Sequence, residues 1–241
     1  MWIKIPKITK KQCKRAYQVC VERKNVRKFP LKILTGAKEC GTIYKTLTDK
    51  GAIMDKQQMM QEYNHKIKRV MITQEEIAQK IAEVGKQIDE WYDGRPLLLV
   101  SILKGSFVFL ADLCRAINSP CEIGFMCAKS YYNQTVSSGI VNITMDLEQD
   151  VSNYHVIIVE DIVDTGRTLN DVTKLLKARN PLSLRVVTLL DKPSRRLVEF
   201  TPDLSLFTIP DFFVIGYGLD GGELFRNLPY IAEYNLDEEE N

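Results

Sequence analysis

Residues 156–169 constrain the fold of this 241-residue chain more than any other segment. Val156–Val159 is a short, apolar, β-branched run, which predicts a strand buried on both faces of a parallel sheet. Two carboxylates, Glu160 and Asp161, end this run in an acidic turn, and a helical pattern follows from Leu169. The order of strand, acidic turn, hydroxyl-rich loop and helix predicts an α/β unit with an anion site at the start of the helix.

The loop between this strand and helix has the composition of a phosphate site. It carries, in order, Asp164, Thr165, Gly166, Arg167 and Thr168. Its backbone N–H groups and two hydroxyls can donate hydrogen bonds to an anion. Three carboxylates beside a phosphate would repel a bare nucleotide. Glu160 and Asp161 are explained if they accept hydrogen bonds from sugar hydroxyls or face a hydrated Mg²⁺.

This segment resembles the ribose-phosphate signature of the purine phosphoribosyltransferases, whose ligand is phosphoribosyl pyrophosphate. The resemblance implies that residues 164–168 bind the ribose phosphate. It also implies that Glu160 and Asp161 bind the ribose hydroxyls and a Mg²⁺ cofactor. Asp164 then becomes the candidate base that removes the N7 proton of the purine. A structural role for Asp164 as an N-cap, alone or combined with the catalytic one, is the alternative.

Two upstream segments extend the resemblance. Ser101–Ser106, which contains Lys104 and Gly105, resembles the pyrophosphate loop of hypoxanthine-guanine phosphoribosyltransferases. In that family the peptide bond before the matching lysine can be cis. Ser130 and Tyr131 precede a polar stretch that resembles the family's mobile lid, although a long hairpin connection explains this loop equally well.

Two downstream segments resemble the purine pocket and its surroundings. The resemblance implies that Lys192 donates to the exocyclic oxygen of a 6-oxopurine, a group that adenine lacks. Phe213 would stack on the purine ring, and the backbone of Val214 would meet the edge of the base. Asp220 falls where the family places a group near the metal and the base, and Arg226 where it contacts pyrophosphate.

The remaining pattern predicts an α/β fold with a mainly parallel, twisted sheet flanked by helices. Thr73–Glu76 has the form of a capping box, and Leu97–Leu103 and Leu184–Leu190 are continuous apolar runs typical of central parallel strands. The resemblance covers about residues 65–235 and implies a type I phosphoribosyltransferase fold. We expect a domain over residues 54–241, with its core at about 70–192. A small hood from about 54–72 and 193–241 would lie over the base site.

The first 53 residues differ in charge from the rest of the chain. They carry 14 Lys or Arg against three acidic residues, whereas residues 54–241 carry 19 basic and 28 acidic residues. A basic arm for nucleic acid or an anionic membrane would explain this charge. We favour an extension that is poorly structured or non-essential, with Met54 as the true start, because its apolar residues follow no helix or strand period.

Residues 1–53 contain no apolar stretch long enough for a signal sequence or a membrane span. The six cysteines of the chain show no zinc-site spacing, so they are interpreted as reduced, mostly buried thiols of a cytoplasmic protein: Cys13, Cys20, Cys40, Cys114, Cys121 and Cys127. The resemblance implies a homodimer or homotetramer.

The resemblance therefore implies Mg²⁺-dependent transfer of a phosphoribosyl group to hypoxanthine or guanine, which releases pyrophosphate. The rival hypothesis is a regulator that senses phosphoribosyl pyrophosphate and binds nucleic acid through residues 1–53. Regulators of that kind tend to lose catalytic and base-pocket groups, whereas Lys104, Asp164, Lys192 and Arg226 are all present. The enzyme is the preferred interpretation, with nucleic acid not expected as a partner.

Overall fold

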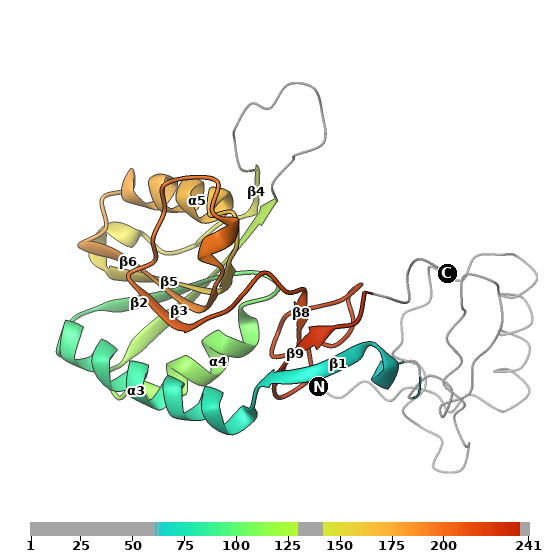
Figure 1. Cartoon of the computed structure of the whole chain (residues 1–241). Helices are drawn as coiled ribbons and strands as arrows, with labels where there is room; N and C mark the ends of the chain where they lie inside the picture. The colour runs from blue at the N-terminus through green and yellow to red at the C-terminus, as the bar shows by residue number, and fades with distance from the viewer. Residues whose placement is uncertain (1–60, 62, 130–141, 237–241) are drawn as a thin grey trace, which may run out of the picture. The chain divides into compact units, whose positions relative to one another are not determined.

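The chain divides into two units, Met1–Met60 and Gln61–Asn241. This computed structural model describes residues 61, 63–129 and 142–236 of the second unit (Figure 1). The expected extension, residues 1–53, lies outside the described residues, as do Ser130, Tyr131 and the polar loop that follows them. None of the described helices is both long and apolar enough to cross a membrane.

The larger sheet has six strands in the order β4-β3-β2-β5-β6-β7. Their bounds are Leu97–Ile102 for β2, Cys121–Lys129 for β3, Asn142–Met145 for β4, His155–Val163 for β5, Ser183–Asp191 for β6 and Leu204–Thr208 for β7. All neighbouring pairs are parallel except β3 and β4. The predicted α/β fold with a mainly parallel sheet is confirmed.

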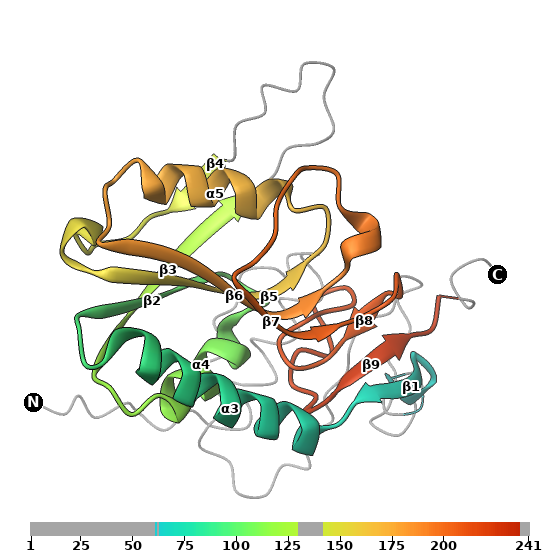
Figure 2. The same ribbon diagram turned by 60° about the vertical axis from the view of Figure 1, so that its left-hand side comes forward.

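Helices cover both faces of this sheet (Figures 1 and 2). Two helices, α3 (Gln74–Tyr92) and α4 (Phe107–Ala116), lie on one face, and α5 (Arg167–Lys177) lies on the other. Each side has its own apolar core, centred on residues such as Ile88 and Leu176. The sheet is therefore buried on both faces, as the continuous apolar runs in its central strands require.

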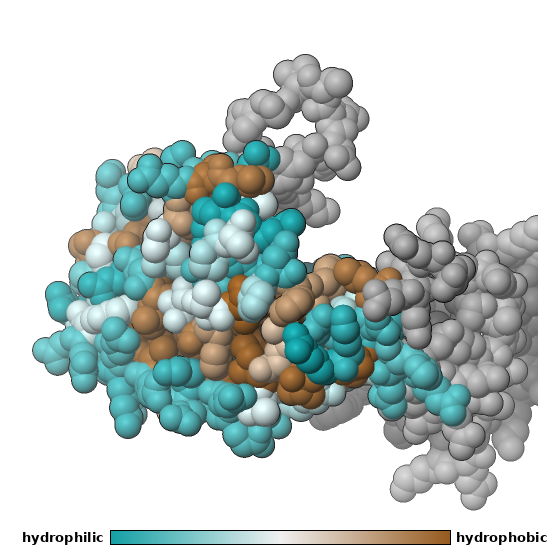
Figure 3. All heavy atoms as spheres, viewed as in Figure 1, coloured by the Kyte–Doolittle hydropathy of each residue, from teal (hydrophilic) through white to brown (hydrophobic). Residues whose placement is uncertain are grey.

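The helix α3 begins where its capping residues predict. The Thr73 hydroxyl accepts the N–H of Glu76, and the Glu76 carboxylate accepts the N–H of Thr73. The apolar stripe that includes Ile77 and Ile88 is buried. Figure 3 shows hydrophilic residues over the outer side of this helix and hydrophobic residues between it and the sheet.

A second, three-stranded antiparallel sheet has the order β1-β9-β8. It joins β1 (Ile67–Ile72), which precedes the core, to β8 (Val214–Ile215) and β9 (Ile231–Tyr234), which follow it. Both ends of the domain thus contribute to the small sheet. The strand β7, however, falls within the segment expected in the hood but pairs with β6 and extends the main sheet.

Candidate active site

The strands β2 and β5 are parallel neighbours, so the loops after them open on the same edge of the sheet. A cleft of about 230 Å³ lies there. Its lining includes half of the residues predicted for the site: Lys104, Gly105, Glu160, Asp161, Asp164, Thr165, Gly166 and Thr168. The fold therefore brings the signature segment and the turn after β2 together. Their order in the sequence alone did not predict this contact.

The predicted acidic turn is wrong. Glu160 and Asp161 lie within β5, which continues to Val163. Pairing with β6 persists at Glu160↔Thr188 and Val163↔Asp191, and this ladder keeps the charged segment extended. The turn begins only at Asp164, so the two carboxylates are held by the sheet rather than by a loop.

Glu160 and Asp161 are in a strongly desolvated position. Burial raises the pKa of Glu160 well above its ordinary value, and the neighbouring charge of Asp161 adds to the shift. Burial also raises the pKa of Asp161 to about 6, although the backbone N–H of Ile162 opposes the shift. Among the described residues, Glu160 Oε2 is buried without a hydrogen-bond partner. Such a pair fits Mg²⁺, which binds one or two carboxylates and retains several waters.

Asp220 was predicted as a third metal group, but it does not complete a cluster. No set of three or more acidic, His or Cys side chains suited to a metal ion occurs in the described ranges. Asp220 Oδ1 lies 2.7 Å from Arg226 Nη2, and Oδ2 accepts the N–H of Glu223 at 2.8 Å. Its carboxylate orders its own loop in this structure.

The turn after β2 packs directly on the acidic strand. A Cβ atom on Gly105 would lie 1.5 Å from Asp161 Oδ2, so a side chain at this position would collide with the carboxylate. The carbonyl oxygen of Gly105 also lies 2.0 Å from where Gly218 would carry a Cβ, and Gly218 has a φ of +100°. The Leu103–Lys104 peptide bond is cis.

The two predicted pyrophosphate cations converge on one carboxylate. Lys104 Nζ lies 2.9 Å from Glu223 Oε2, and Arg226 Nη2 lies 3.4 Å from the same oxygen. Arg226 Nη1 also donates to the carbonyl of Gly218. Glu223 was not predicted as a site residue. The only sequence feature that could have indicated its role is its position three residues before Arg226.

The phosphate loop ends in a glycine cap. Gly166 is the N-cap of α5 with a φ of +79°, a conformation that favours glycine. Thr165 Oγ1 accepts the N–H of Arg167 at 3.4 Å. The alternative interpretation of Asp164 as the N-cap is therefore wrong, because the N-cap is Gly166, two residues later, and this cap makes no side-chain hydrogen bond.

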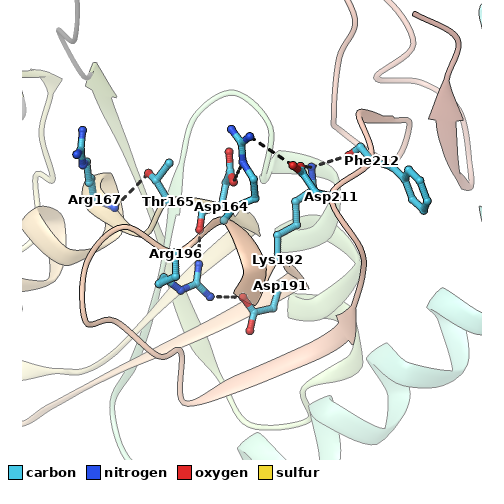
Figure 4. A network of polar contacts seen from close by, with 9 residues as sticks. Asp164, Thr165, Arg167, Asp191, Lys192, Arg196, Asp211 and Phe212 are labelled. Atoms are coloured by element: carbon cyan, nitrogen blue, oxygen red, sulfur yellow. Dashed lines mark hydrogen bonds and ion pairs between the residues drawn. The ribbon is translucent and has the colours of Figure 1, made fainter.

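Asp164 is instead held by two arginines that sequence reasoning missed (Figure 4). Arg195 Nε lies 3.0 Å from Asp164 Oδ1, and Arg196 Nη1 donates to the Asp164 carbonyl at 2.5 Å. Arg196 also pairs with Asp191 at the end of β6. The sequence feature that could have identified these arginines is that they form an adjacent basic pair shortly after Lys192 and Pro193.

The predicted base-pocket residues lie beside these arginines. Lys192 is 8% exposed, and its ammonium donates to the carbonyl of Phe212 at 2.5 Å (Figure 4). The ring of Phe213 is exposed and packs edge-on against Tyr234. Val214 opens β8. The Lys192 ammonium thus contacts the backbone of the residue next to Phe213, which brings a mostly buried cation to the segment that carries an exposed aromatic ring. This arrangement is suited to a flat polar heterocycle.

The sequence and fold have clear relatives. Residues 70–221 match the model of the phosphoribosyl transferase domain. The chain is 46% identical over 166 residues to a hypoxanthine-guanine phosphoribosyltransferase of Streptococcus pneumoniae. This alignment covers 69% of this chain and 92% of the relative. The chain is also 46% identical over 172 residues to the hypoxanthine phosphoribosyltransferase of Escherichia coli, covering 70% of this chain and 97% of the relative.

A solved structure shares the fold. The crystal structure of a hypoxanthine phosphoribosyltransferase from Staphylococcus aureus superimposes with a TM-score of 0.71 at 43% identity. The match covers 75% of this chain and 98% of that one. The chain belongs to the phosphoribosyltransferase family, and within it to the hypoxanthine-guanine phosphoribosyltransferases of purine salvage.

Proposed function

We propose that the cleft transfers the 5-phosphoribosyl group of phosphoribosyl pyrophosphate to hypoxanthine or guanine, with Mg²⁺ as cofactor. A purine nitrogen forms the new bond to the anomeric carbon while the bond to pyrophosphate breaks, and the products are IMP or GMP and pyrophosphate. The observation that carries the proposal is the convergence of the half-buried pair Glu160–Asp161 with the Lys104–Gly105 turn in one cleft.

The cleft supplies groups for both ends of the ribose phosphate. The loop at Thr165–Thr168 would hold the 5-phosphate at the start of α5, because the backbone N–H groups and the dipole of a helix N-terminus favour an anion. Glu160 and Asp161 would orient the ribose hydroxyls and hold Mg²⁺. When bound, this ion would neutralise part of the charge on the pyrophosphate.

Lys104 and Arg226 would stabilise the leaving pyrophosphate electrostatically. Glu223 occupies both cations here. Because the ammonium of Lys104 is well exposed, exchange of the Glu223 carboxylate for a substrate phosphate would cost little desolvation. Asp220, which pairs with Arg226, would then lie near the same ligand. The resemblance implies that Ser130 and Tyr131, which lie outside the described residues, also bind the substrate.

Asp164 would accept the N7 proton of the purine. Its carboxylate lines the cleft next to the ribose-binding strand. Lys192 would donate to the 6-oxo group with the protons that Phe212 does not use, since an ammonium carries three donors. Phe213 would stack on the ring and the Val214 backbone would meet its edge.

We also propose that the enzyme assembles as a homodimer or homotetramer. Phe107, Ile123 and Phe125 are large apolar side chains that are more than a third exposed near the α4 side of the sheet. Static light scattering on the purified protein checks this proposal.

The direct experiment is a spectrophotometric assay of the purified chain with phosphoribosyl pyrophosphate, Mg²⁺ and each purine in turn. Product from hypoxanthine or guanine, dependent on Mg²⁺, is expected. A gel-shift assay with and without phosphoribosyl pyrophosphate tests the rival regulator, and we expect no specific nucleic-acid complex.

A further inference from the structure

A short 3₁₀ turn after the base-pocket lysine lies against the phosphate loop. This turn, η4, spans Pro193–Arg195 and directly follows Lys192. The N–H of Leu197, two residues after the turn, donates to the carbonyl of Thr165 at 3.0 Å. This hydrogen bond holds the segment next to the loop. Arg195 therefore lies next to the loop that carries the candidate base.

Arg195 pairs with two carboxylates, those of Asp164 and Asp211. Its Nε lies 3.0 Å from Asp164 Oδ1, and its Nη1 lies 3.4 Å from Asp211 Oδ2. The guanidinium contacts only one oxygen of Asp164, so the second oxygen can face a substrate proton. The planar fork of arginine fixes this geometry better than a point charge would.

The neighbouring Arg196 has a different role. It donates to the backbone carbonyl of Asp164 and pairs with Asp191, and its side chain is only 15% exposed. Arg195 and Asp164 are 47% and 40% exposed. An ion pair at that exposure contributes little to folding stability. Stability therefore explains Arg196 but not Arg195.

We infer that Arg195 is a positioning residue that holds the Asp164 carboxylate ready to accept the purine proton. The inference rests on the proposed role of Asp164 as base. Before the purine arrives, Arg195 fixes one carboxylate oxygen and so restricts the rotamers of Asp164. Asp211, on the other side of the guanidinium, keeps Arg195 itself in place.

A double-mutant cycle on kcat tests this inference. With hypoxanthine and phosphoribosyl pyrophosphate saturating, Arg195→Met should lower kcat by about tenfold, since misplacing a catalytic group is costly. The Michaelis constant for phosphoribosyl pyrophosphate should stay within about twofold, because the loop amides are untouched. Arg195→Lys should recover part of the lost rate. In an Asp164→Asn background, Arg195→Met should change kcat by less than about twofold.

Arg179→Met is the matched control, because Arg179 forms an ion pair of 2.7 Å with Asp146 outside the cleft. Its kcat should equal that of the parent, and thermal unfolding should show that every variant folds. Unchanged kcat in Arg195→Met overturns the inference, as does an effect that multiplies with that of Asp164→Asn. Full turnover by Asp164→Asn alone would instead refute the proposed base together with the inference, so each failure is recognised in a different variant.

Discussion

Gly105 and Asp161 face each other so closely that a Cβ atom on Gly105 would lie 1.5 Å from Asp161 Oδ2. This contact joins the turn after β2 to the acidic end of β5. It also explains why Lys104, which precedes the glycine, lines the same cleft as the two carboxylates. The cation proposed for the pyrophosphate and the carboxylates proposed for the ribose are thereby brought to the same cleft.

The replacement Gly105→Ala should disrupt this arrangement. The added methyl group must displace the Asp161 carboxylate or the turn, so kcat/KM for phosphoribosyl pyrophosphate should fall by roughly 10²-fold or more. Steady-state kinetics with hypoxanthine saturating measures the effect. Lys80→Ala is the control, because the half-exposed Lys80 side chain pairs with Glu83 on α3 and does not line the cleft. It should leave kcat/KM unchanged, and an equally active Gly105→Ala protein would refute the steric argument.

Asp161 should reduce stability in the absence of metal. Its pKa is about 6 in the folded protein, above the ordinary value of 3.8, because burial penalises the charge. A group whose folded pKa is raised favours folding below its unfolded pKa, and this contribution is lost as the pH rises through about 6.

Asp161→Asn should therefore stabilise the metal-free protein at pH 8 by about 1–2 kcal/mol, a value reduced from the full shift for solvent screening. The difference should vanish near pH 4, and activity should be lost. Urea unfolding with a chelator present measures both pH values. A variant that is less stable than the parent at pH 8 would contradict this account of the acidic pair.

Asp164→Asn should separate binding from turnover. The phosphate-loop amides and Thr165 are unchanged, so binding of phosphoribosyl pyrophosphate in a calorimetric titration should be nearly that of the parent. Turnover should fall by roughly 10²- to 10⁴-fold, the usual loss for a general base. If saturating substrates restore the parental rate, Asp164 has no part in the mechanism.

Protein that starts at Met54 should remain folded and active within a small factor of the full-length chain. The reason is that the described elements, from β1 onward, form both sheets and the whole cleft. Circular dichroism and the transferase assay compare the two proteins. Aggregation or lost activity would place part of residues 1–53 within the domain.

Local pattern was sufficient for most elements of the main sheet. The continuous apolar runs predicted β2 and β6, and the capping residues at Thr73 and Glu76 predicted the start of α3, because these signals act within a few residues. The predicted end of β5 was wrong. Adjacent carboxylates rarely occupy a strand, and pairing with β6 keeps them in one here.

Contacts between distant segments could not be predicted from local pattern. The small sheet pairs Ile67 with Tyr234, and the ion pair of Lys104 with Glu223 joins residues that are 119 positions apart. The pairing of Arg195 with Asp164 depends on how η4 folds back on the phosphate loop. The resemblance to a family named the site residues, half of which line one cleft, but it gave none of these partners.

The role proposed for Lys192 predicts which bases the enzyme uses. A buried ammonium that meets the 6-oxo group forms a charge-assisted hydrogen bond of about 1.5–3 kcal/mol. Adenine places an amino donor there, and a site built for an acceptor can reject such an analogue by roughly 10⁴-fold. Lys192→Ala should raise the Michaelis constants for both oxopurines far more than that for phosphoribosyl pyrophosphate. The exposed Lys80→Ala variant should change neither constant.

The most direct measurement compares hypoxanthine, guanine and adenine as substrates of the unmodified protein. Each base is supplied with phosphoribosyl pyrophosphate and Mg²⁺, and nucleotide formation is followed by absorbance. We predict turnover of hypoxanthine or guanine and no measurable product from adenine. Efficient turnover of adenine would contradict the role of Lys192 and the specificity proposed for the cleft.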